Sequence, residues 1–142
     1  MNRLVELFAV VSLACGPALA QSICSTHTIR GNWGVTCTGN LTPAANAPLT
    51  PTRILGTCTS TLEGEFQCEG TMSLGGIILA QTMSGKAIVN ENCTGTIRYI
   101  QTLDGKPAPD MNIRFLIFDN GKLIDGLPVD KGANLACTLK RM

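Results

Sequence analysis

Aromatic residues and histidine are scarce in this sequence of 142 residues, which contains one Trp, one Tyr, four Phe and one His. Aromatic cages and sugar-stacking platforms both need several rings in one place. The composition therefore argues against either kind of site. It also means that the hydrophobic core has to be built mainly from Ile, Leu, Val and Met.

An excess of one charge is also missing. Eleven Lys and Arg stand against ten Asp and Glu, a formal net charge of +1, and no basic stripe is present. Proteins that bind nucleic acid or an anionic membrane surface usually carry such a stripe. We therefore expect neither partner.

No apolar run reaches the roughly 20 residues that a membrane-spanning helix needs, so no integral membrane span is expected. The N-terminus instead has Arg3, a short apolar segment from Leu7 to Ala14, and the small-x-small step Ala18-Leu19-Ala20. This order is typical of a secretory signal peptide. We expect cleavage after Ala20, and one secreted or periplasmic domain over residues 21–142.

Cysteine is plentiful, with seven residues. Cys15 leaves with the signal peptide; its lipidation is the alternative, although Ser12 stands where a bacterial lipobox normally has leucine. An even number of cysteines in an exported chain predicts disulfides, here three. We expect no metal site, because there is no C-x-x-C step and His27 is the single histidine, and we expect no cofactor. The six remaining cysteines are Cys24, Cys37, Cys58, Cys68, Cys93 and Cys137.

Short β-rich runs follow one another along the chain, separated by turn steps at Glu63-Gly64, Ser84-Gly85, Asp104-Gly105 and Asn120-Gly121. These residue pairs tolerate the positive φ angles of tight hairpins. Such spacing without helical periods indicates an antiparallel barrel or sandwich, and we predict an all-β, antiparallel meander β-barrel of about eight strands. The expected strands are 28–38, 53–60, 65–73, 77–83, 86–90, 94–101, 112–118, 122–125 and 134–140.

The segment from Gly39 to Pro51 differs, since it holds three prolines and little that could pack. We expect a loop between the first two strands. It either covers the mouth of the barrel or is simply solvated.

One disulfide pairing follows from hairpin geometry. If Leu62-Glu63-Gly64 is a three-residue loop with Gly64 in the left-handed position, counting outward places Cys58 opposite Cys68. Alternation of the ladder makes this a closely spaced, non-hydrogen-bonded pair that a disulfide can span. A closed meander brings the first and last strands together, which favours Cys37–Cys137 and leaves Cys24–Cys93.

No catalytic constellation can be assigned, and the catalytic residues are unknown. A nucleophile would need His27 as its base, and disulfide-bonded cysteines cannot act as thiolates. Glu63, Glu65 and Glu69 gather in one hairpin, where a two-residue period indicates a solvated face.

Arg98 and Arg114 are the candidate ligand-binding residues. If their strands pair across a 102–111 loop with Gln101 near Met111, the two arginines face each other. Facing arginines repel unless they share an anion or are solvated. The hypothesis is a barrel interior in which both hold the carboxylate or another oxyanion of a small apolar ligand. The alternative places both on the outer face, because the opposite faces are the better core, with Ile97, Tyr99, Ile113, Phe115 and Ile117.

The segment Ser84-Gly-Lys-Ala-Ile-Val-Asn-Glu-Asn-Cys-Thr-Gly-Thr96 resembles the "tGtYtVnxdCtGt" segment of small uncharacterised secreted bacterial proteins, and the likeness extends over about residues 54–141. Lys86-Ala87 departs from the pattern, which usually has a Tyr-bearing strand there. The resemblance implies a calycin-like or allene-oxide-cyclase-like barrel with an apolar cavity. It assigns no catalytic residue.

The segment Arg30-Gly-Asn-Trp33 is similar to the opening strand of avidin-like and lipocalin-like barrels, where Gly-x-Trp packs against the barrel base. This likeness implies the same place for Trp33. Biotin binding is not implied, because the other tryptophans of a biotin site are missing.

The function expected from these features is non-enzymatic: an exported β-barrel that binds a small apolar or amphipathic ligand, or serves as an interaction module. The alternative is a barrel cyclase or isomerase in which one or two polar groups polarise the substrate. A third class, a proteinase inhibitor or adhesion protein, would use exposed loops such as Gly39–Pro51. The oligomeric state is left open.

Overall fold

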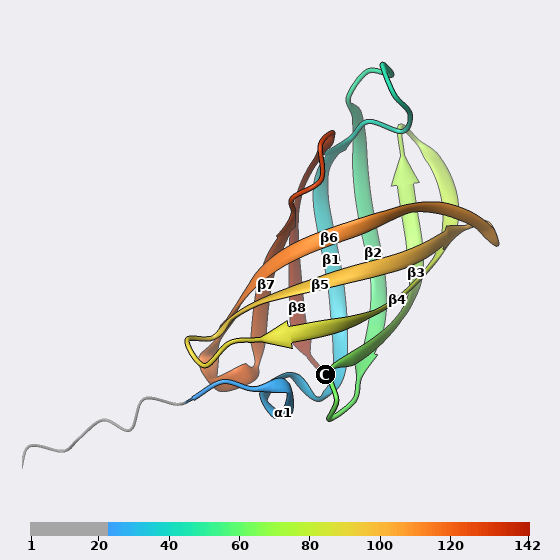
Figure 1. The fold of residues 1–142 in the computed structure, drawn as a ribbon. Coiled ribbons are helices and arrows are strands. Elements are labelled where there is room, and N and C mark those ends of the chain that lie inside the picture. Colours follow the sequence, from blue (N-terminus) through green and yellow to red (C-terminus); the bar gives the residue numbers. More distant parts are fainter. Residues whose placement is uncertain (1–22) are drawn as a thin grey trace, which may run out of the picture.

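The computed structural model describes residues 23–142, which form a closed antiparallel barrel in which each strand pairs with the next in sequence (Figure 1). The predicted barrel is confirmed. The predicted signal peptide and Cys15 lie outside the described residues. The strands are β1 (Gly31–Leu41), β2 (Thr50–Ser60), β3 (Glu65–Leu74), β4 (Ile77–Val89), β5 (Thr94–Leu103), β6 (Lys106–Phe118), β7 (Leu123–Pro128) and β8 (Ala133–Arg141).

The barrel closes where β8 pairs with β1, in a register that runs from Trp33 opposite Arg141 to Leu41 opposite Ala133. Figure 1 shows β5 and β6 crossing the barrel at a large angle to β1 and β2 behind them. This steep difference in direction follows from the accumulated right-handed twist of successive strands. It also gives the wall a strongly curved outer surface.

Buried and exposed residues alternate along the strands, so one face of each strand forms the core and the other forms the surface. In β5, Ile97, Tyr99 and Gln101 are buried, whereas Arg98 and Ile100 are exposed. Side chains on a strand point alternately to opposite faces, so the interior receives every second residue. The interior is mostly aliphatic, as the scarcity of aromatic residues predicts.

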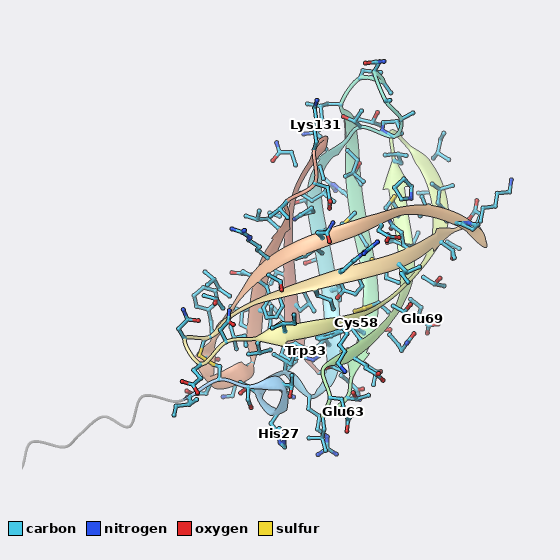
Figure 2. All side chains as sticks on the ribbon, viewed as in Figure 1. His27, Trp33, Cys58, Glu63, Glu69 and Lys131 are labelled. Carbon is cyan, nitrogen blue, oxygen red and sulfur yellow. A yellow bond between two sulfur atoms is a disulfide. The ribbon has the colours of Figure 1, made fainter. Side chains whose placement is uncertain are left out.

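The base of the barrel is covered by the short helix α1 (Thr26–Ile29), which occupies part of the first predicted strand. Ile29 and Trp33 are fully buried there, and the Trp33 Nε1–H donates to the carbonyl of Ile29 over 2.9 Å. Figure 2 shows Trp33 near this end, next to the helix that bears His27. The expected place of Trp33 at the barrel base is confirmed.

Two turn predictions were wrong. Ser84-Gly85 is not a turn, because β4 continues through it and Gly85 pairs with both Phe66 and Tyr99. The expected 102–111 loop is also absent from the described chain: β5 and β6 extend to a tight turn at Asp104-Gly105. The turn step at Asp104-Gly105 was itself predicted and is confirmed. At Ser84-Gly85, pairing with strands on both sides, rather than local propensity, holds the segment extended.

The three disulfides have the predicted pairing. Cys58–Cys68 and Cys37–Cys137 each join directly opposed residues with Cα atoms 4.0 Å apart. The third, Cys24–Cys93, ties the N-terminal segment to the turn between β4 and β5. Gly64 has φ +82°, the left-handed position on which the Cys58–Cys68 prediction depended.

The segment between β1 and β2 is a loop over residues 42–49, as expected, although the strands extend further into it than predicted. At its ends the Thr42 N–H donates to the Gly132 carbonyl, and the Pro51 carbonyl accepts from the Gly75 N–H. Within residues 23–142, no helix is long and apolar enough to span a bilayer.

Candidate functional site: a groove on the outer wall

The barrel interior is filled. Its cavity beneath β5–β8 measures only about 30 Å³, whereas small-molecule sites commonly have about 300–1,000 Å³. The family resemblance implied an apolar cavity inside the barrel. As a prediction of a ligand site this is wrong, because the cavity is too small for a ligand. Large inward side chains cause this, and Tyr99 and Phe115 project into the space that remains. Burial raises the pKa of the Tyr99 phenol well above its ordinary value.

Two buried glutamines form a hydrogen-bonded polar pair in the interior, which the sequence analysis did not single out. The Gln81 Nε2 donates to Gln101 Oε1 over 2.9 Å, and the Gln101 Nε2 donates to the Pro109 carbonyl over 2.6 Å. Gln81 Oε1 is buried without a hydrogen-bond partner in the described chain. Gln81 lines a hollow of about 10 Å³, room for one water molecule at most. These amides therefore belong to the packed interior of the barrel.

The prediction that Arg98 and Arg114 face each other in the interior is wrong. Arg98 pairs with Asn112 and Arg114 with Thr96, because a bulge between Tyr99 and Gln101 and the tight turn beyond it shift the register. Both arginines point outward and are exposed. The alternative weighed at the sequence level, an outer-face position, is the observed one.

The two arginines differ in their partners. Arg98 donates to Asp110 through Nε and Nη2, at 3.0 and 2.6 Å, and its side chain is 71% exposed. The side chain of Arg114 makes no hydrogen bond or ion pair with any residue in the described range 23–142. Arg114 also lines a large hollow on the outer wall, and Arg98 does not.

This hollow is a groove of about 1,130 Å³ on the outer wall, which we call the lateral groove. It crosses the end of β1, the start of β5, the C-terminal part of β6, and parts of β7 and β8. Leu116 and Leu127 project into it from neighbouring strands and are 47% and 56% exposed. The lining residues are Thr38, Gly39, Asn40, Asn90, Thr94, Gly95, Thr96, Arg114, Phe115, Leu116, Asp125, Gly126, Leu127, Pro128, Ala133, Asn134, Leu135, Ala136, Cys137 and Thr138.

The groove lies over the shortest strand pairing of the barrel wall, which is the one between β7 and β8. The β7–β8 ladder joins four residue pairs in the described chain and ends at Gly126 opposite Cys137. The same register would next bring Ala136 opposite Leu127, and then Leu135 opposite Pro128, which has no backbone N–H to donate. The strands diverge at this point, and the buried residues Leu135 and Cys137 become part of the groove floor. The Gly126-Leu-Pro128 step was the available sequence signal, and it was missed.

The remaining sequence candidates lie elsewhere. His27 is exposed on α1, outside the barrel base (Figure 2). Glu63, Glu65 and Glu69 are exposed on the β2–β3 hairpin, and Glu69 borders a separate polar hollow of about 370 Å³ over β2–β4. Among residues 23–142, no three His, Cys, Asp or Glu side chains gather in a way that could hold a metal ion.

Comparisons with known proteins support the fold alone. No protein-family model and no curated protein matches the sequence. Among solved structures, the chain is similar to a redesigned β-barrel, mFAP1, bound to DFHBI, with a TM-score of 0.51 and 14% sequence identity. The match covers 82% of this chain and 98% of that chain. Two closed barrels at this identity share an architecture, and a ligand site does not follow from it.

Proposed function

We propose that this protein is an exported, non-enzymatic binding protein that holds a small apolar or amphipathic molecule in the lateral groove. The observation that carries the proposal is the contrast in volume between the groove, about 1,130 Å³, and the filled interior, about 30 Å³. Exposed leucines beside polar side chains at one concave surface are the usual composition of a ligand site.

Export is supported by the predicted signal peptide and by the three disulfides, which persist in oxidising compartments. The proposal includes the likeness to small secreted bacterial proteins with calycin-like barrels. The packing of Trp33 at the covered base, in a Gly-x-Trp step, supports that likeness.

Probe binding with a matched pair of variants tests the groove. Ala136 is exposed in the groove, and Ala80 is exposed on the outer face of β4 away from it. We expect the neutral fluorescent probe N-phenylnaphthylamine to bind the wild type and Ala80→Trp, and to lose at least about tenfold in affinity with Ala136→Trp, roughly 1.4 kcal/mol. Equal binding by both variants would place the probe elsewhere and contradict the proposal.

Native mass spectrometry tests the existence of a natural ligand. Protein purified from its own host is measured before and after organic extraction. A mass that decreases to that of the mature chain on extraction supports a bound apolar molecule. An unchanged mass, together with no probe binding, would favour the interaction module instead.

A further inference from the structure

Arg114 lines the lateral groove, with Thr96 opposite it on β5 and Leu127 opposite it on β7. Leu116, two residues further along β6, projects to the same face. The guanidinium is thus the single cation among the described groove residues, and large exposed apolar side chains lie beside it.

The guanidinium of Arg114 is also unpaired within the described residues. Arg98, on the neighbouring strand and equally outward-facing, is neutralised by Asp110 at 2.6 Å. A guanidinium presents five N–H donors in a planar fork that matches a carboxylate or another oxyanion. An apolar molecule that covers Leu127 would displace water from this fork and strengthen its attraction to an anion.

One carboxylate lies in the groove, and its position sets the orientation of a ligand. Asp125 is opposite Leu116, and this pair lies two residues along β6 and β7 from the Arg114–Leu127 pair. Its Oδ1 accepts a hydrogen bond from the Thr138 hydroxyl over 2.8 Å. An anionic group is therefore favoured at Arg114 and disfavoured at the Asp125 end.

We infer that the groove selects an anionic amphiphile: an apolar body over Leu116, Leu127 and Ala136, with one carboxylate or sulfonate held by Arg114. This inference rests on the proposed function and adds the ligand class and the residue that determines it. Arg98 has no part in it.

Two probes with the same rings separate charge recognition from apolar binding. Anilinonaphthalenesulfonate carries an anionic group, and N-phenylnaphthylamine lacks it. Because hydrogen bonds to charged groups contribute more than neutral ones, we expect the wild type to bind the anionic probe about tenfold more tightly than the neutral one. Arg114→Gln should abolish this preference and change the affinity for the neutral probe less than about twofold.

Matched variants complete the test. Arg98→Gln removes the same charge from the same outer face and should leave both affinities unchanged. Asp125→Asn should raise the affinity for the anionic probe about two- to threefold, since it removes a like charge from the groove. The near-ultraviolet circular dichroism of Trp33, which lies at the base, reports whether each variant has folded.

The outcomes distinguish this inference from the proposed function. If the neutral probe binds in the groove but the anionic probe is not preferred, or if Arg98→Gln acts like Arg114→Gln, the anionic ligand class is wrong and the groove site stands. If neither probe binds, or Ala136→Trp changes neither, the proposed function fails and this inference fails with it.

Discussion

The guanidinium of Arg141 lies over the indole ring of Trp33, with its Cζ 4.6 Å from the ring centroid. The same guanidinium donates to the carbonyls of Thr28, Arg30 and Gly121. It thereby joins the end of β8 to the helix at the base and to the turn before β7. A cation over an aromatic face and hydrogen bonds to three carbonyls both stabilise this closure.

Removing this guanidinium should destabilise the protein without affecting the groove. For Arg141→Met we expect a loss of about 1–3 kcal/mol in the free energy of unfolding, from the cation–π contact and the charged hydrogen bonds. Urea unfolding followed by Trp33 fluorescence measures it. Lys140→Met removes an adjacent exposed cation and should stay within about 0.5 kcal/mol. Equal midpoints for the two variants would contradict this account.

The disulfides should differ in how much they stabilise the folded protein, because they close loops of different length. Cys37–Cys137 spans 100 residues and Cys58–Cys68 spans 10. Chain entropy predicts losses of about 4.7 and about 2.7 kcal/mol, respectively, when each pair is replaced by serines. Chemical denaturation of the two double variants gives the comparison. A larger loss for Cys58–Cys68 would mean that native packing, and not chain entropy, dominates.

Local features of the sequence predicted the architecture well, because turn chemistry and strand alternation act over a few residues. The Glu63-Gly64 turn fixed the register through Cys58 and Cys68, and closure of a meander placed Cys37 beside Cys137. The candidate site was predicted less well. The tight turn at Asp104-Gly105 and a bulge after Tyr99 together determine the partner of Arg98, and no local pattern indicates such a bulge. The volume left inside a barrel likewise depends on how all inward side chains pack together.

Gly95 should not tolerate a side chain. A Cβ at this position would collide with the ring of Phe115 and the carbonyl of Ile88. We expect Gly95→Ala to cost about 1–3 kcal/mol, as overpacking usually does. Gly34→Ala is the matched control, since a Cβ there makes only ordinary contacts with Met142 and the Lys140 carbonyl. Thermal unfolding of both variants measures the difference, and a stable Gly95→Ala variant would show that Phe115 can move aside.

The buried phenol of Tyr99 makes stability fall at alkaline pH. Its pKa is raised by burial, so near and above the ordinary tyrosine value of about 10 the unfolded chain loses this proton while the folded chain keeps it. The unfolded state then binds fewer protons, and the free energy of unfolding decreases as pH rises through this range. Below about pH 9 this contribution is constant.

Tyr99 is the single tyrosine in the sequence, so near-ultraviolet absorbance follows its ionisation directly. We expect the phenol to ionise together with alkaline unfolding, and Tyr99→Phe to weaken the decline in stability above about pH 10. Ionisation near pH 10 in the folded protein would show that the phenol is accessible to solvent.

The Cys37–Cys137 disulfide changes what a cut in the chain can do. It makes residues 37–137 a covalent ring, and the exposed tip of the 42–49 loop lies within that ring. Loop tips of this kind are where proteases cut first. A single cut there opens the ring and leaves one molecule, with both new ends attached to paired strands. For a protein proposed to work outside the cell, this means that the first proteolytic cut in the loop does not release any part of the barrel.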